Sequence, residues 1–240
     1  MNLVIDYGNS SAKVGIFSQQ KLVEKYVFPS SDDLIAFVKK STTENIIVSS
    51  VSAHDALLIA NSLPSAKHRL VLNKTLPLPI INHYATPATL GVDRLAAVCG
   101  AQCLYPGENC LVIDAGTCIT YDFIDSQAKY LGGGISPGMS MRFQAMNTFT
   151  ANLPLVQPAT SPPLIGNSTE SCMQSGVVNG ILAEISGIVA QYQKKLGDLK
   201  IILCGGDAAF FENQMKEVIF VIPELVLSGL NSILIHNVNL

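Results

Sequence analysis

Two short segments of the sequence combine an aspartate, a glycine and a polar side chain at the same spacing. The first reads Asp6-Tyr7-Gly8-Asn9 and the second reads Asp114-Ala115-Gly116-Thr117, and each follows the apolar run Leu-Val-Ile. The glycine allows the backbone to approach a ligand closely, and a carboxylate oxygen is the kind of ligand that Mg²⁺ prefers. The pattern therefore indicates two turns that could bind the phosphates of a nucleotide together with their cation.

Each turn alone could have a simpler origin, because Asp-x-Gly sequences also end ordinary β-hairpins and an aspartate can merely stabilise a turn. Their recurrence at the start of each half of the chain favours two related domains, at residues 1–108 and 109–240. By analogy, the duplication resembles the actin-like, sugar-kinase and Hsp70 superfamily. The expected fold class is therefore α/β, with two tandem ribonuclease-H-like domains and a cleft between them.

Strands and helices must position these turns, and the periodicity of apolar residues predicts where they lie. The expected strands are residues 2–6, 11–17, 21–28, 45–51, 69–72, 111–124 (a hairpin), 129–131, 199–203 and 217–222. The expected helices are one from Ser30 or Ser31, then 54–62, about 92–104, one after Gly138, one from about 167 to 195, one between Asp207 and the strand at 217–222, and one at the end of the chain.

Glycines mark two further places in the second half. In the run 132–138, three glycines precede an expected Ile-Ser-Pro-Gly turn and bring bare backbone next to a ligand or a partner domain. Asn167 with Glu170 three residues later has the spacing of a capping box. Gly176 and Gly180 in the helix that follows cost about 1 kcal/mol each relative to Ala, which favours close packing of this helix against another, as across a dimer.

The segment Gly91-Val92-Asp93-Arg94 places an acidic and a basic residue in the first turn of the helix predicted at 92–104. Asp93 alone could simply interact favourably with the helix dipole. An arginine in the same turn gains nothing from that dipole, so the pair suggests a role beyond helix stability.

Composition excludes several classes of protein. The chain has 240 residues, 48% of them hydrophobic, and a net charge of −3, so it can bury a core and offers no basic patch for nucleic acid. We find neither a signal-peptide pattern nor an uninterrupted apolar run of the ~18 residues that a membrane span needs, so a cytoplasmic protein is expected. The six cysteines and four histidines lack metal-ligand spacing and are expected to be reduced thiols and isolated imidazoles.

Four motifs in a fixed order together resemble the type III pantothenate kinase family over essentially the whole chain. They are Asp6-x-Gly8-Asn9-Ser10-x-x-Lys13, Gly91-x-Asp93-Arg94, Asp114-x-Gly116-Thr117 and Gly133-Gly134-Ile135-x-Pro137-Gly138. The chain departs from the family at Ser10, where Thr is usual, and at Cys204, where Thr is common before the Gly-Gly turn. The second departure concerns only contacts to adenosine.

The resemblance implies a reaction and a role for each motif residue. The reaction is ATP-dependent phosphorylation of pantothenate to 4′-phosphopantothenate, the first step of coenzyme A biosynthesis, by a homodimer that uses Mg²⁺ and a monovalent cation, K⁺ or NH₄⁺. Asp93 corresponds to the catalytic base, and Arg94 would bind the pantothenate carboxylate. Pantothenate contacts are implied for Tyr84, Gly91, Val92, Asp93, Arg94 and, from across the dimer, Thr169. ATP contacts are implied for Asp6, Tyr7, Gly8, Asn9, Ser10, Ser11, Ala12, Lys13 and Thr117, and metal contacts for Asp6 (Mg²⁺) and Asp114 (the monovalent cation).

Three of these residues also fit purely structural roles. Lys13 could be a solvated strand residue, Tyr84 a packing residue, and Thr169 a helix cap. The protein could also be a kinase for another small hydroxylated substrate, or a nucleotide-binding regulatory protein without turnover. The Gly91-x-Asp93-Arg94 motif argues against the first function, and the presence of all three aspartates of the motifs argues against the second.

Overall fold

The structure is a computed structural model that describes residues 1–8, 11–50, 59, 61–62, 66–212, 214–215 and 219–240. Two compact units make up the chain. Unit 1 consists of Met1–Glu108, Ile124–Gly132 and Glu224–Leu240, and unit 2 consists of Asn109–Phe123 and Gly133–Pro223.

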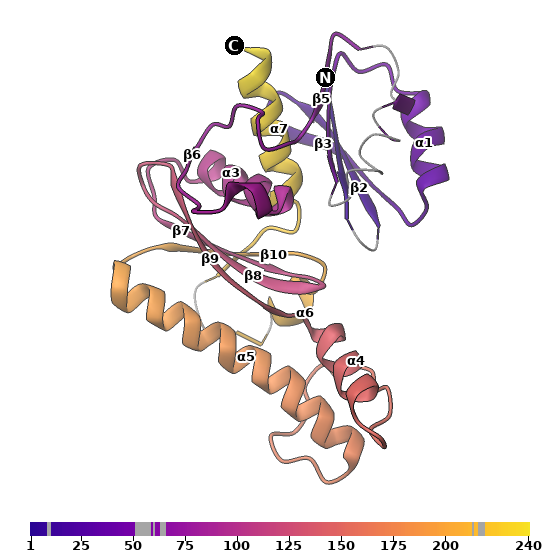
Figure 1. Ribbon diagram of the computed structural model, residues 1–240, viewed down its shortest axis with the longest axis vertical. Coiled ribbons are helices and arrows are strands. Elements are labelled where there is room, and N and C mark those ends of the chain that lie inside the picture. The colour runs from indigo at the N-terminus through magenta and orange to yellow at the C-terminus, as the bar shows by residue number, and fades with distance from the viewer. Residues whose placement is uncertain (9–10, 51–58, 60, 63–65, 213, 216–218) are drawn as a thin grey trace. The chain divides into compact units, whose positions relative to one another are not determined.

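Strands and helices alternate along the chain (Figure 1). The strands are β1 (Asn2–Tyr7), β2 (Ala12–Ser18), β3 (Lys21–Phe28), β4 (Asn45–Ser50), β5 (His68–Val71), β6 (Ile81–Asn82), β7 (Cys110–Ala115), β8 (Cys118–Ile124), β9 (Lys129–Pro137), β10 (Lys200–Cys204) and β11 (Phe220–Val221). The helices are α1 (Ser31–Lys39), α3 (Val92–Leu104), α4 (Met139–Phe149), α5 (Thr169–Leu196), α6 (Ala208–Glu212) and α7 (Leu225–Val238), with a short 3₁₀ turn at Pro87–Thr89.

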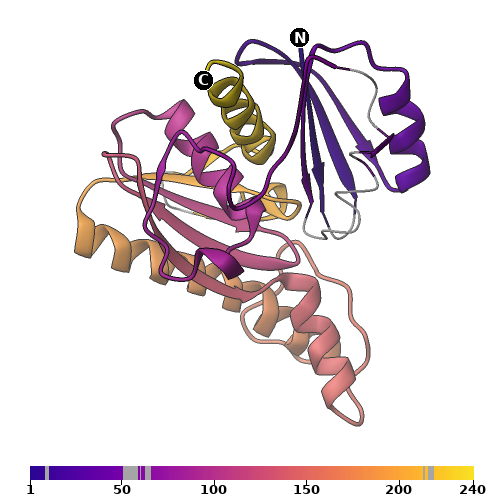
Figure 2. The ribbon, with the colours of Figure 1, turned by 45° about the horizontal axis from the view of Figure 1, so that its top comes forward.

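The first sheet has five strands in the order β3-β2-β1-β4-β5. β1 pairs antiparallel with β2 and parallel with β4. Apolar residues of these strands and of α1 form one core, and α1 lies along the sheet in both ribbon views (Figure 2). As expected, this helix begins after Ser30, whose side chain accepts a hydrogen bond from the backbone N–H of Asp33.

The second sheet repeats the order of the first. It reads β11-β10-β7-β8-β9-β6, so that β9-β8-β7-β10-β11 correspond to β3-β2-β1-β4-β5, with β6 added at one edge. β10 pairs parallel with β7, as β4 does with β1. The α/β class and the duplication predicted from the two Asp-x-Gly turns are therefore confirmed. The domain assignment of 1–108 and 109–240 stays a prediction.

Helix α3 is held by close contact with α7, and both belong to unit 1. A Cβ atom on Gly229 would lie 1.7 Å from the carbonyl oxygen of Ala96, and one on Gly100 would lie 2.4 Å from that of Leu225. Only glycine permits such backbone contact. This packing fixes the first turn of α3, which carries Asp93 and Arg94.

Helix α5 covers one face of the sheet of unit 2 (Figure 1). Ile181, Ile185 and Val189 lie in the same core as Leu111 and Ile113 of β7. By length and composition α5 would also suffice to cross a membrane. The core helix of a globular unit passes the same test, and the buried face of α5 identifies it as such a helix.

Two local expectations were wrong. The strand expected at 129–131 continues to Pro137 as β9, so residues 135–137 belong to the strand and not to a turn. The glycines allow this because they lie against the backbone of β8: a Cβ on Gly133 would lie 1.6 Å from the Tyr121 carbonyl oxygen. The capping box of α5 uses Ser168 and Ser171, not Asn167 and Glu170. The helix expected at 54–62 and the strand expected at 217–222 lie partly outside the described residues.

Candidate active site

The first Asp-x-Gly turn joins β1 to β2 in unit 1. Asp6 is the register partner of Lys13 on β2 and of Ser49 on β4. Register partners present their side chains on the same face of a sheet, so a carboxylate, an ammonium and a hydroxyl group gather near the ends of these strands. The backbone N–H of Gly8 donates to the carbonyl oxygen of Ser11 at 3.1 Å and closes the turn.

The remaining residues predicted to bind ATP in this turn contribute in different ways. Ala12 lies in the hydrophobic core and Tyr7 packs against it, so the backbone of each is what a phosphate could reach. Asn9 and Ser10 lie outside the described residues. The Ser49 hydroxyl is 1% exposed and has no hydrogen-bond partner within the described part of the chain, which fits a polar ligand beside Asp6.

The second Asp-x-Gly turn joins β7 to β8 in unit 2. The backbone N–H of Gly116 donates to the carbonyl oxygen of Cys118 at 3.0 Å, and Thr117 at the tip is exposed. The turn after β10 packs against it, with the N–H of Asp207 donating to the Ala115 carbonyl oxygen at 2.9 Å. Burial raises the pKa of Asp207 above its ordinary value. Asp114 is half-buried at the end of β7.

The start of α3 accounts for the spacing Gly-x-Asp-Arg. The Asp93 carboxylate folds back and accepts a hydrogen bond from the backbone N–H of Arg94 at 2.9 Å. A Cβ on Gly91 would lie 2.3 Å from this carboxylate oxygen, so the glycine leaves room for the side chain. Asp93 stays half-exposed in the first turn of α3.

Arg94 is 7% exposed, and its guanidinium lies over the Tyr84 ring at 5.5 Å from the centroid. Tyr84 in turn stacks on Tyr130 with 6.0 Å between ring centroids. An aromatic ring face attracts a guanidinium, and the planar fork of N–H groups on a guanidinium matches a carboxylate. The structure thus brings Tyr84 close to Arg94, the neighbour of Asp93 at the start of α3, and the roles expected for these residues stay predictions.

Tyr130, which the sequence did not indicate, is fully buried and supports the Tyr84 ring. Its strand meets the loop of Tyr84 through the pairing of β6 with β9, where the N–H of His83 donates to the Tyr130 carbonyl oxygen at 2.9 Å. An aromatic residue in an apolar strand normally indicates core packing, so no local signal could have found it.

Thr169 is the first residue of α5 and is exposed. The helix cap is its neighbour Ser168, so capping does not account for Thr169. It borders an open pocket of about 760 Å³ in unit 2, lined also by Met146, Leu153, Cys172 and Gly176. Thr169 is therefore an exposed residue at the edge of this pocket.

Gly91→Ala is expected to lower kcat about tenfold with little loss of stability. The added methyl group would clash with the end of the Asp93 side chain. Because this side chain can rotate to another rotamer, the fold should stay stable, but the carboxylate would no longer occupy its wild-type position. Steady-state kinetics and thermal unfolding of the variant measure both effects; the factor corresponds to about 1.4 kcal/mol of transition-state stabilisation. Unchanged kcat would show that this carboxylate position does not matter.

Known proteins resemble this chain over most of its length. A family model described as type III pantothenate kinase matches residues 2–191. The type III pantothenate kinase of Christiangramia forsetii is 46% identical over 241 residues, covering 99% of each chain. Among solved structures, one described as a Baf family transcriptional activator from Campylobacter jejuni has 24% identity and a TM-score of 0.66, covering 99% of this chain and 100% of its own.

A structure described as a 2-dehydro-3-deoxygalactonokinase from Sinorhizobium meliloti has 15% identity and a TM-score of 0.56, covering 97% of this chain and 98% of its own. At these identities the two structures show a shared fold alone, and the second confirms the expected sugar-kinase-like fold. The family model and the relative that is similar over its full length show more than a shared fold. The chain belongs to the type III pantothenate kinase family.

Proposed function

We propose that this protein transfers the γ-phosphoryl group of ATP to the primary hydroxyl of pantothenate, giving 4′-phosphopantothenate in the first step of coenzyme A biosynthesis. The observation that carries the proposal is the start of α3, where the Asp93 carboxylate is half-exposed beside Arg94 stacked on Tyr84. A carboxylate can accept the proton of an attacking hydroxyl, and a guanidinium can bind a carboxylate through paired hydrogen bonds. Pantothenate has both a primary hydroxyl and a carboxylate.

Each residue then has one task. Asp93 accepts the hydroxyl proton as the oxygen attacks phosphorus, a transfer that a loose transition state requires only late. Arg94 binds the pantothenate carboxylate, and Tyr84 holds the guanidinium and lines the substrate. Gly91 and Val92 contact pantothenate through their backbone atoms.

The phosphates of ATP are assigned to the two turns. Residues 6–13 offer backbone N–H groups and the Lys13 ammonium, and Thr117 offers its hydroxyl. Asp6 would hold Mg²⁺ and Asp114 the monovalent cation, K⁺ or NH₄⁺. Within the described residues, no three His, Cys, Asp or Glu side chains form a metal cluster. Mg²⁺ at ATP takes most of its ligands from phosphate and water, so single carboxylates fit this role, and the ion would neutralise charge on the phosphates.

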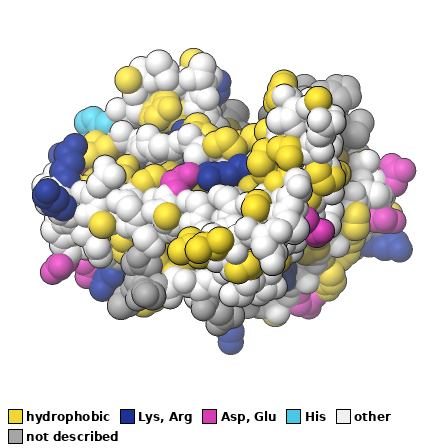
Figure 3. Space-filling view, turned by 90° about the horizontal axis from the view of Figure 1, so that it is seen from below, with side chains coloured by type: hydrophobic (Ala, Val, Ile, Leu, Met, Phe, Trp, Pro, Cys, Tyr) yellow, Lys and Arg dark blue, Asp and Glu magenta, His cyan; other side chains and the backbone are white. Residues whose placement is uncertain are grey.

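The protein is further proposed to act as a homodimer, with Thr169 reaching the pantothenate site of the partner. Large apolar side chains near the pocket of Thr169 are exposed: Phe149 by 85%, Leu164 by 81% and Ile165 by 86%. Apolar side chains gather in patches on the side of the molecule shown in Figure 3. A Cβ atom added to Gly176 or Gly180 would have no atom of the described residues within 4 Å. Such a surface suits a partner chain, and a second copy accounts for the two glycines.

Mixed dimers test the shared site. A chain carrying both Asp93→Asn and Thr169→Ala is combined with wild-type chains, and heterodimers are isolated. If the site is shared, one site lacks the base, which costs about 10²–10⁴-fold, and the other lacks the Thr169 hydroxyl. Activity should then fall below half of the wild-type value by the factor that Thr169→Ala alone costs, which is measured in the Thr169→Ala homodimer. Activity near half would mean that each chain forms its own intact site.

The proposed function itself is tested by ADP release with a panel of acceptors. Pantothenate is expected to support turnover, whereas sugars and acetate are not. Turnover with a sugar would favour a kinase for another substrate, and nucleotide binding without turnover would favour a regulatory protein. A cytoplasmic location, without nucleic-acid or membrane partners, is proposed together with this metabolic role.

A further inference from the structure

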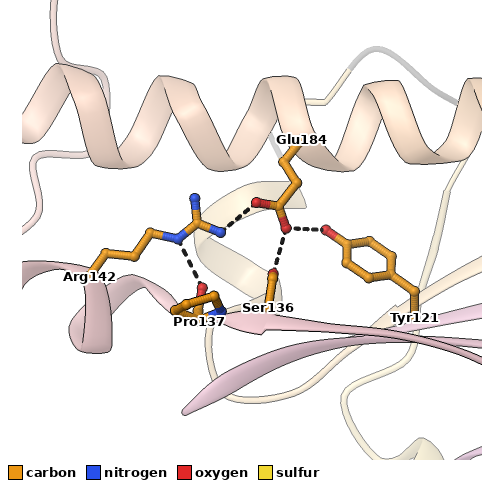
Figure 4. A network of polar contacts seen from close by, with 5 residues as sticks. All are labelled: Tyr121, Ser136, Pro137, Arg142 and Glu184. Carbon is orange, nitrogen blue, oxygen red and sulfur yellow. Dashed lines mark hydrogen bonds and ion pairs between the residues drawn. The ribbon is translucent and has the colours of Figure 1, made fainter. Parts of the chain in front are cut away.

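A polar network in unit 2 centres on the carboxylate of Glu184 in α5 (Figure 4). Its Oε1 accepts from the Ser136 hydroxyl at 2.5 Å and from the Tyr121 hydroxyl at 2.9 Å. Its Oε2 accepts from the Arg142 guanidinium at 2.6 Å. One side chain therefore connects α5 to β8, to β9 and to α4.

The network continues through Arg142 toward the second Asp-x-Gly turn. The Nε of Arg142 donates to the Pro137 carbonyl oxygen at 2.9 Å (Figure 4). The next residue, Gly138, donates its backbone N–H to the carbonyl oxygen of Thr117 at 3.0 Å. A Cβ on Gly138 would lie 2.1 Å from the carbonyl oxygen of Gly116. The end of β9 is thus pressed against the backbone of the turn that carries Thr117.

The charge of Glu184 gives the network its strength. Burial alone would raise the pKa of this carboxyl, but the hydrogen bonds from Ser136, Arg142 and Tyr121 outweigh it and lower the pKa below its ordinary value. Burial and the hydrogen bond to Glu184 raise the pKa of Tyr121. Glu184 therefore stays ionised and Tyr121 protonated at neutral pH, and hydrogen bonds to a charged acceptor are stronger than neutral ones.

Attachment of α5 to the sheet does not by itself account for this arrangement. Ile181 and Ile185 on either side of Glu184 are already in the core. The donors from Ser136 and Arg142 instead act on residues 136–138, the segment in direct contact with the turn. We propose that Glu184 is a positioning residue for ATP, which holds the end of β9 so that the backbone and hydroxyl of Thr117 stay in place for a phosphate. The inference rests on the proposed role of Thr117 in binding ATP.

Glu184→Gln tests the inference. The amide oxygen can still accept from Ser136 and Tyr121, but the amide NH₂ faces the Arg142 guanidinium and breaks that link alone. Competition binding should show an ATP affinity about tenfold weaker, the size of one weakened charge-assisted hydrogen bond, and an unchanged adenosine affinity. KM for pantothenate should not change.

Ser175→Ala is the matched control. The Ser175 hydroxyl also ties α5 to the rest of unit 2, by donating to the Leu164 carbonyl oxygen at 2.8 Å, but it does not lead to the turn. Its loss should reduce thermal stability and leave the affinities for both ATP and adenosine unchanged. If Glu184→Gln does not fold, Arg142→Gln removes the same link from the other side and is measured in the same way.

Three results separate the possibilities. Weaker binding of ATP with unchanged binding of adenosine supports the positioning role. Unchanged ATP affinity, or equal weakening of ATP and adenosine, would overturn it and leave Glu184 as a structural residue. A wild-type protein that binds no ATP would overturn the proposed function, and this inference with it.

Discussion

Replacing Asp93 by Asn is expected to lower kcat about 10²–10⁴-fold, the usual contribution of a general base. The variant should still fold and bind ATP. The Asn side chain oxygen can accept the same hydrogen bond from the Arg94 N–H that the carboxylate accepts at 2.9 Å, so the start of α3 is preserved while the basic oxygen is lost. The measurement is steady-state turnover of pantothenate together with direct titration of ATP.

A matched control is Asp32→Asn, which also changes an aspartate in the first turn of a helix, in this case α1. It should alter neither kcat nor ATP affinity. Near-normal kcat in the Asp93→Asn variant would show that another group, or water alone, takes the hydroxyl proton.

Arg94→Ala is expected to raise KM for pantothenate by about 10–150-fold, because a hydrogen bond to a charged group contributes about 1.5–3 kcal/mol. KM for ATP should change little. Arg94 is 7% exposed and stacks on Tyr84, so the alanine variant also loses packing. Arg94→Lys therefore serves as a second variant that keeps the charge and most of the volume but cannot form the paired contact.

Pantothenol separates the two contributions of Arg94. It lacks the carboxylate, so the loss of the guanidinium should affect its turnover much less than that of pantothenate. An equal penalty for pantothenol and pantothenate in both variants would rule out recognition of the carboxylate and leave Arg94 with a packing role.

The sequence predicted best those features that depend on neighbouring residues. The two Asp-x-Gly turns, the strands beside them and the helix that begins near Asp93 follow from local periodicity and turn chemistry. The repeated Leu-Val-Ile-Asp-x-Gly segment also predicted two related halves, and the strand orders of the two sheets repeat accordingly.

Contacts between segments that are distant in the sequence could not be predicted from local periodicity or turn chemistry. Tyr130 reaches Tyr84 only through the pairing of β6 with β9. The segment Ile-Ser-Pro-Gly at 135–138 has the composition of a turn, but β9 runs on to Pro137, because its glycines lie against the backbone of β8. The capping box of α5 was misplaced because Ser171, a residue outside the usual Glu or Gln preference at that position, provides the second hydrogen bond.

The central claim is that this chain phosphorylates pantothenate, and the most direct test is to identify the product. Purified protein is incubated with ATP, Mg²⁺, K⁺ and pantothenate, and ADP and phosphorylated pantothenate are quantified by mass spectrometry. We expect equal amounts of ADP and 4′-phosphopantothenate, and no product from the Asp93→Asn variant above about one per cent of wild type. ADP release that does not depend on pantothenate, with no phosphorylated product, would contradict the account.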